Sequence, residues 1–127
     1  MNGHFDDVTL DELGNFWIAS LGPNAYGYQT PGGVAMYDGS SWTIYNTSNS
    51  GLAHNETDEV DVDLLGNKWF STKLGVSKFN GTTWTTYTYA NTNGGLSSDH
   101  PDFIYIDRMG NKWFGRWSVG VTRFCGD

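Results

Sequence analysis

The sequence predicts an all-β protein, and three observations carry this prediction. A Gly-Asn-x-Trp motif begins at Gly14, Gly66 and Gly110, and an aspartate lies three residues before each glycine. Stretches of alternating apolar and polar residues lie beside these motifs, as expected of half-buried strands. The composition, with 16% aromatic residues, 17 glycines and only 17% charged residues, is typical of short strands joined by many turns.

Two further landmarks recur with the same period. Gly-Val begins at residues 33, 75 and 120, so successive copies are separated by 42 and 45 residues. An aromatic residue followed by Asp/Asn-Gly and then by Trp occurs at 37–42 and again, 42 residues later, at 79–84. A period in the low forties with four short strands in each copy is the signature of a β-propeller blade. We therefore predict three four-stranded antiparallel blades, of which the last is incomplete.

The first blade is predicted over about residues 1–46, with strands near 7–11, 15–20, 33–37 and 41–46. Gly14 is expected to take a positive φ in the first hairpin. Asp38-Gly39 predicts a type I′ turn before the last strand. An insertion of about ten residues lies within 21–32.

The second and third blades follow over about residues 55–89 and 101–127, and the whole chain 1–127 is treated as a single domain. In the second blade we predict strands near 59–63, 68–72, 75–79 and 83–88. The third blade lacks its fourth strand. The segment Asn2-Gly3-His4-Phe5 faintly resembles the missing turn and aromatic residue, so it is a candidate for the outer strand that closes a ring.

Composition also excludes several classes of partner. The net charge of −7, from 14 acidic and 7 basic residues, disfavours nucleic acid and anionic membrane surfaces. No stretch is long and apolar enough for membrane insertion, and no signal peptide is visible. Cys125 is the single cysteine, and no motif with the spacing of metal ligands occurs, so we expect no metal and no cofactor.

The motif Asp-x-x-Gly-Asn-x-Trp, followed by Gly-Val-x-x-Tyr/Phe-Asp/Asn-Gly and Trp-x-x-Tyr, resembles the repeat of the two-component regulator propeller family. The resemblance runs from about Val8 to Phe124. That family builds periplasmic sensor domains of hybrid two-component systems, which face glycan fragments and relay binding to a kinase. The resemblance implies a β-propeller, a periplasmic or extracellular location, and a carbohydrate or another small polar molecule as ligand.

Three blades are fewer than a closed propeller needs, since such rings typically contain about four to eight blades. The two open flanks would expose apolar packing surfaces, which mark an interface. A head-to-tail assembly could close the ring with six blades from two chains or nine from three. Six lies within the usual range, so a homodimer is expected first and a homotrimer next. The alternative is a piece of a longer protein.

Residues that recur in every copy are interpreted as structural. Equivalent tryptophans are predicted to pack between blades rather than to stack on a sugar: Trp17, Trp69 and Trp113 at one position, Trp42 and Trp84 at another. The repeated aspartates, Asp11, Asp63 and Asp107, could be metal ligands or the carboxylates of a glycosidase. Because each lies just before a Gly-Asn turn, we predict instead that they accept hydrogen bonds from turn amides.

Residues that do not recur are the candidates for ligand binding. In a propeller, the link between the second and third strands of a blade shares a rim with the connections between blades, and loops on a rigid scaffold commonly carry function. Aromatic, cationic and imidazole side chains gather on this rim: Tyr26, Tyr28, His54, Lys73, His100, Arg116 and Trp117. The alternatives are loop packing and a subunit contact.

We therefore expect a noncatalytic ligand-recognition module. A protein–protein interaction scaffold is the alternative, and a propeller lyase or hydrolase is a third possibility. An enzyme is not expected, because the sequence shows no nucleophile–base pair and no pair of carboxylates outside the repeated positions.

Overall fold

The computed structural model describes residues 7–20, 32–96, 98–116 and 119–124. These residues form eleven strands and no helix. The first sheet contains β1 (Asp7–Leu10), β2 (Phe16–Ser20), β3 (Gly33–Tyr37) and β4 (Trp42–Tyr45). The second contains β5 (Thr57–Val62), β6 (Lys68–Thr72), β7 (Gly75–Phe79) and β8 (Trp84–Tyr87). The third contains β9 (Phe103–Ile106), β10 (Lys112–Arg116) and β11 (Gly120–Phe124).

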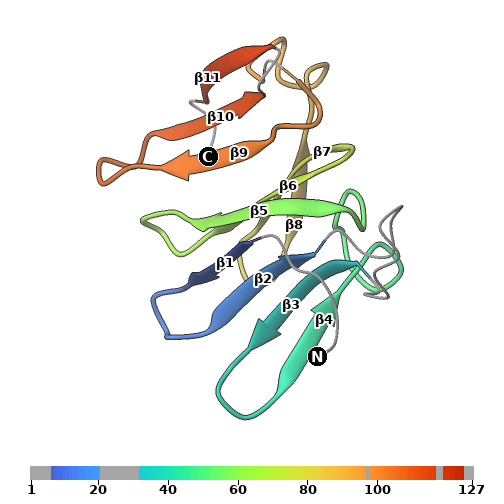
Figure 1. The fold of residues 1–127 in the computed structure, drawn as a ribbon, viewed down its shortest axis with the longest axis vertical. Helices are drawn as coiled ribbons and strands as arrows, with labels where there is room; N and C mark the ends of the chain where they lie inside the picture. The colour runs from blue at the N-terminus through green and yellow to red at the C-terminus, as the bar shows by residue number, and fades with distance from the viewer. Residues whose placement is uncertain (1–6, 21–31, 97, 117–118, 125–127) are drawn as a thin grey trace.

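Each sheet is a meander in which neighbouring strands in the chain pair antiparallel. The sheets follow one another along the molecule, and β1, β5 and β9 run side by side where successive sheets meet (Figure 1). The predicted fold class is confirmed: three antiparallel propeller blades, the last with three described strands. The candidate outer strand at residues 2–5 lies outside the described residues, and the closed ring stays a prediction.

Two apolar layers hold the sheets together. Between the first and second sheets lie side chains that are less than a tenth exposed: Trp17, Ala19, Val34, Leu52, Val60, Phe70 and Phe79. Between the second and third sheets lie Trp69, Val76, Leu96, Ile104, Phe114 and Phe124. The second layer repeats the ring geometry of the first. Trp17 lies 6.0 Å from Phe70 at an interplanar angle of 49°, and Trp69 lies at the same distance and angle from Phe114.

The tryptophan prediction is confirmed where a neighbouring sheet exists. Trp17 and Trp69 are 3% and 0% exposed, and Trp84 packs against the first layer. Trp42 is 48% exposed and contacts Tyr37 within its own sheet, because no described sheet covers that side. Trp113 is half-buried on the opposite flank for the same reason.

The predicted role of the repeated aspartates is also confirmed. Oδ1 of Asp11 accepts hydrogen bonds from the backbone N–H groups of Leu13 and Asn15, each at 2.9 Å. Oδ2 accepts the side-chain amide of Asn15 and, at 2.7 Å, the indole N–H of Trp17. Asp63 and Asp107 repeat the pattern. Gly14 has the expected positive φ of 83°.

The predicted type I′ turn at Asp38-Gly39 is wrong. That turn needs a positive φ at two successive residues, and of this pair only Gly39 has one, at 96°. The carboxylate of Asp38 instead accepts the N–H groups of Ser40 and Ser41 at 2.8 and 2.7 Å. The backbone of Asp38 pairs with Ser41, so the central residues of the turn are Gly39 and Ser40. Hydrogen bonds to the Asp38 carboxylate thus stabilise this turn without a left-handed backbone conformation at Asp38.

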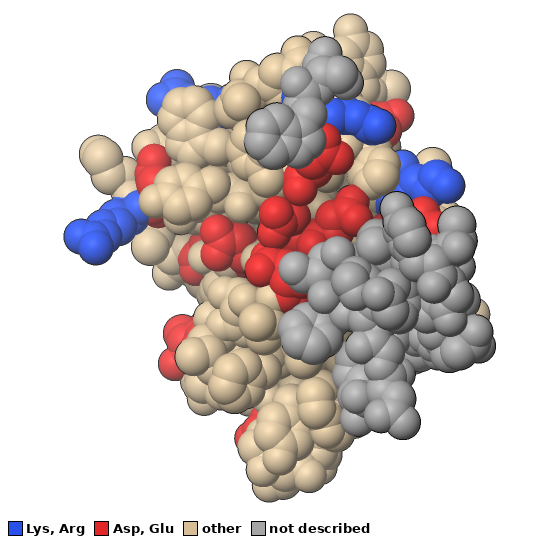
Figure 2. Space-filling model, viewed as in Figure 1, with Lys and Arg blue, Asp and Glu red and all other residues tan. Residues whose placement is uncertain are grey.

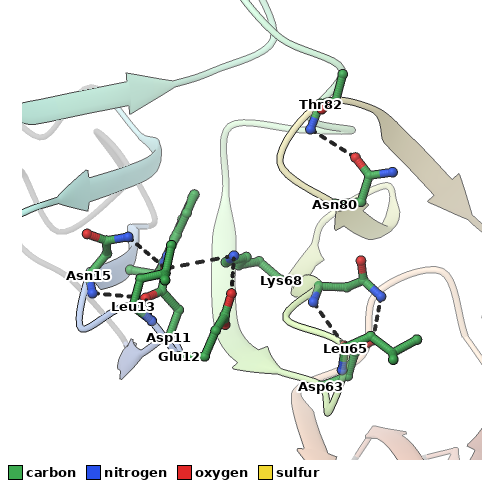
Figure 3. A network of polar contacts seen from close by, with 11 residues as sticks. Asp11, Glu12, Leu13, Asn15, Asp63, Leu65, Lys68, Asn80 and Thr82 are labelled. Atoms are coloured by element: carbon green, nitrogen blue, oxygen red, sulfur yellow. Dashed lines mark hydrogen bonds and ion pairs between the residues drawn. The ribbon is translucent and has the colours of Figure 1, made fainter.

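A lysine spans the boundary between the first two sheets. Nζ of Lys68 lies 3.7 Å from Oδ2 of Asp11 and 3.7 Å from Oε1 of Glu12 (Figure 3). It also lies 5.4 Å from the centroid of the Trp17 ring. The side chain of Lys68 is 9% exposed, and its buried ammonium group is matched by two carboxylates and an aromatic face.

Candidate functional site

The connections between the sheets lie on one rim of the molecule, opposite the β1–β2 and β5–β6 hairpin turns (Figure 1). We call this the connection rim and define it by residues 46–56, 73–74, 88–96 and 98–102. Of the predicted ligand-binding residues, His54, Lys73 and His100 belong to it, and Arg116 ends the neighbouring strand β10. The other three, Tyr26, Tyr28 and Trp117, lie outside the described residues.

Three separate elements meet around His100. Its Nε2 lies 2.6 Å from Oδ2 of Asp58, which belongs to β5 of the second sheet. Arg116 donates from Nη1 to the backbone carbonyl of His100 at 3.2 Å. The side chains of His100 and Asp58 are 29% and 23% exposed. Through His100, Asp58 of the second sheet and Arg116 of the third sheet are therefore linked, while the polar edges of His100 and Asp58 stay partly open to solvent.

A second polar group forms around Glu56. Its carboxylate lies 3.6 Å from Nζ of Lys73, and its backbone carbonyl accepts the N–H of Lys73 at 3.2 Å. The N–H of Glu56 donates to Nδ1 of His54 at 3.0 Å. Lys73 is 56% exposed and remains accessible beyond its ion pair. The structure thus brings His54 and Lys73 together through Glu56, and His100 and Arg116 together beside Asp58.

Sequence reasoning missed both acidic partners. Glu56 and Asp58 open the acidic stretch 56–63, in which five of eight residues are Asp or Glu. When the blades are aligned on Asp63 and Asp107, Glu56 is equivalent to His100. One copy carries a carboxylate where the next carries an imidazole. Comparison of the copies could therefore have shown that the fold does not require one residue type at this position, which makes it a candidate for function.

Acidic side chains also gather over the middle of the face shown in Figure 2, where β1, β5 and β9 run side by side. Oδ2 of Asp7 accepts the N–H of Val60 at 3.1 Å, and Oδ2 of Asp61 accepts the N–H of Ile106 at 2.9 Å. Each carboxylate thus links a first strand to the first strand of the next sheet. The role of these two carboxylates seen here is therefore structural.

The environment of Asp61 opposes its ionisation. Burial raises the pKa of this carboxyl above its ordinary value, two backbone hydrogen bonds act in the opposite direction, and the negative charge of Asp7 raises the pKa further. In contrast, the hydrogen bonds to Asp63 outweigh its burial and lower its pKa.

Within the described part of the chain, no group of three or more His, Cys, Asp or Glu side chains is arranged to hold a metal ion. No helix there could cross a membrane.

No family model matches the sequence, and no curated protein sequence matches it significantly. Solved structures do share its fold. The extracellular domain of BT3049 from B. thetaiotaomicron, described as belonging to a hybrid two-component system, has a TM-score of 0.71 and 18% identity, covering 98% of this chain and 18% of that chain. The corresponding domain of BT4673 has a TM-score of 0.65 and 21% identity, covering 87% and 15%.

A catalytically inactive variant of virginiamycin B lyase from Staphylococcus aureus, solved with quinupristin, gives a TM-score of 0.68 and 14% identity, covering 99% of this chain and 39% of that one. This chain thus spans well under half of each of these proteins. The class that these likenesses define is the propeller-repeat fold, which is the fold that the sequence motifs predicted. A sensor domain and an enzyme share it, so the fold alone does not decide the function.

Proposed function

We propose that this chain is a noncatalytic recognition module of the sensor type, and that its connection rim binds a small polar ligand, with carbohydrates as the first class to test. The observation that carries the proposal is the convergence of Asp58, His100 and Arg116 from three separate elements. Two of the solved structures with this fold are extracellular domains described as parts of two-component systems, which supports a sensing role outside the cytoplasm.

The chemistry of the rim suits a neutral polar ligand with many hydroxyl groups. Such a ligand needs both acceptors and donors. The carboxylates of Glu56 and Asp58 can accept, and the charged groups of Lys73 and Arg116 can donate. The strand ends hold these groups on a rigid scaffold, which lowers the cost of ordering them when a ligand binds. The net charge of −7 makes a polyanionic ligand unfavourable.

The test is calorimetric titration of the protein with a panel of neutral and acidic oligosaccharides, followed by analysis of the mixture for cleavage products. We expect binding without turnover. His100→Ala and Lys73→Ala should each weaken binding about tenfold or more, since a hydrogen bond to a charged group contributes roughly 1.5–3 kcal/mol.

Thr82→Ala is the matched control, because Thr82 is exposed in the β7–β8 turn, away from the connection rim. Equal binding by all three variants and the wild type would contradict the assignment of the rim. Product formation would instead favour a lyase or hydrolase, and specific capture of one protein in place of any sugar would favour an interaction scaffold.

A further inference from the structure

We propose that the first and third sheets carry the two halves of a self-association interface, so that the open flank of the first sheet binds the open flank of the third sheet of a second copy, head to tail. The first-sheet flank comprises Val8, Leu10, Phe16, Trp42 and Ile44. The third-sheet flank comprises Tyr105, Trp113, Val121 and Arg123.

The first-sheet flank is an apolar patch on a single sheet face. Strand register places Leu10, Phe16 and Trp42 in one row and Val8 and Ile44 in the next. The exposed fractions of these five side chains are 55%, 44%, 48%, 45% and 39%, in that order. Large contiguous apolar patches on a soluble protein mark interaction surfaces.

The two interfaces between sheets within the chain indicate which surface binds the first-sheet flank. Aligned on the repeated aspartates and on the Asp/Asn-Gly turns, Val8 is equivalent to Val60, and Trp42 to Trp84. Val60 and Trp84 belong to the layer that packs against the first sheet. The first-sheet flank is therefore another copy of a surface that, one repeat later, is buried against a neighbouring blade.

The third-sheet flank is the matching copy of the other side. Trp113 is equivalent to Trp17 and Trp69, which form the centres of the two internal layers. Val121 is equivalent to the buried Val76, yet it is 60% exposed. Because both internal boundaries have the same ring geometry, a third boundary formed between two chains would continue the same stacking.

The position of Phe16 allows the head-to-tail arrangement to be tested. Nζ of Lys68 lies 5.4 Å from the Trp17 ring, and Nζ of Lys112 lies 5.4 Å from the Trp69 ring. The equivalent position in the first sheet is Phe16. In a head-to-tail assembly Phe16 would therefore lie over Trp113 of the second copy, close to the carboxylate of Asp107.

The experiment is absolute mass by light scattering for the wild type, Phe16→Lys and Phe16→Glu over a range of concentrations. The wild type is expected at a multiple of the 14.1 kDa chain mass, with a dimer expected first. Phe16→Lys should retain assembly, because it restores the lysine present at both internal boundaries. Phe16→Glu places a carboxylate beside Asp107 and should weaken assembly at least tenfold. Thermal unfolding monitored by circular dichroism verifies that both variants fold.

A mixing experiment fixes the geometry. Phe16→Glu disrupts only the first-sheet flank, and Val121→Glu disrupts only the third-sheet flank. Each variant alone should be more monomeric than the wild type, whereas their mixture should form a one-to-one complex through the remaining intact pair of flanks. A monomeric wild type would overturn the proposal. Equal weakening by Phe16→Lys and Phe16→Glu, or no complex on mixing, would overturn the head-to-tail arrangement. None of these readouts depends on a ligand of the connection rim.

Discussion

The indole N–H of Trp69 donates to Oδ2 of Asp63 at 2.8 Å, and this bond joins a hairpin turn to the ring at the centre of the second apolar layer. Oδ1 of the same carboxylate accepts the N–H groups of Leu65 and Asn67, each at 2.9 Å. One side chain therefore fixes the turn, the start of β6 and the orientation of the tryptophan together.

Removal of this carboxylate should destabilise the whole molecule. We expect Asp63→Ala to lower the free energy of unfolding by at least about 2 kcal/mol, because it leaves the buried indole N–H and the turn amides without their acceptor. Urea denaturation measures the loss. Asp38→Ala is the control, since that aspartate is exposed and serves only its own turn. An equal loss in both variants would contradict the importance of the indole bond.

Stability should fall in acid for the same reason. The burial of Asp11 and Asp63 opposes ionisation, but the accepted hydrogen bonds outweigh it and hold the pKa of each below the ordinary value. These groups therefore contribute stability above their unfolded pKa of about 3.9 and lose it as the pH falls through the folded pKa. We expect a steep fall in the free energy of unfolding below about pH 4. The fall should be shallower in Asp63→Asn, and equal slopes would contradict the assignment.

Alanine substitution of the repeated tryptophans should lower the free energy of unfolding by different amounts, depending on whether a neighbouring sheet covers the ring. Trp69→Ala should lose about 3–5 kcal/mol of unfolding free energy, because its ring is fully buried. Trp42→Ala should lose about 1 kcal/mol or less when measured on dilute, monomeric protein, because half of its side chain already faces solvent. Thermal unfolding of both variants compares them. Similar losses would show that burial in a single chain does not control these positions.

Two glycines with positive φ offer a matched test of backbone crowding. Gly75 has a φ of 129°, and a Cβ placed there would lie 2.7 Å from the backbone oxygen of Tyr87. Gly81 has a φ of 98° and open space around it. Both alanine variants carry backbone strain, but Gly75→Ala should cost at least about 1 kcal/mol more. Chemical denaturation at one temperature gives the difference, and a larger loss for Gly81→Ala would contradict it.

The charge of Asp7 should be detectable through Asp61. Because the negative charge of Asp7 is one of the causes that raise the pKa of Asp61, Asp7→Asn should lower that pKa. Asparagine retains an oxygen that can accept the N–H of Val60, so the link between β1 and β5 is preserved. Carbon-13 chemical shifts of the Asp61 carboxyl group, followed during a pH titration, measure the change. An unchanged titration would show that the two carboxylates do not interact.

Much of the fold could be predicted because the residues that determine it recur at equivalent positions in each copy of the repeat. The strands β3, β6 and β7 begin and end where the Gly-Val and Gly-Asn-x-Trp spacings predict. The role of Asp63 at its turn followed from its place before Gly66. What the repeats did not indicate is the indole bond, since the spacing of Asp63 and Trp69 does not show that their side chains converge.

The connection rim was less predictable, because its contacts join different copies. His100 and Asp58 are 42 residues apart, one in the connection between β8 and β9 and the other in β5, so only their packing brings them together. The same holds for Asp7 and Val60, whose bond depends on how closely β1 approaches β5. Sequence reasoning found the basic and imidazole groups by their lack of repetition but missed their carboxylate partners.

In the part of the chain that the structure describes, each sheet is built from strands that follow one another in sequence, and no strand is exchanged between sheets. During synthesis, the four strands of the first sheet are complete at Tyr45, before any residue of the second sheet has been made. Chains fold from the N-terminus as they emerge, so the first sheet can form on the ribosome. The Trp17 ring then stays exposed until Phe70 and Phe79 have been synthesised and pack against it. During synthesis, each newly formed sheet therefore exposes an apolar face for a short time. The order of translation determines which sheet is made next and covers that face.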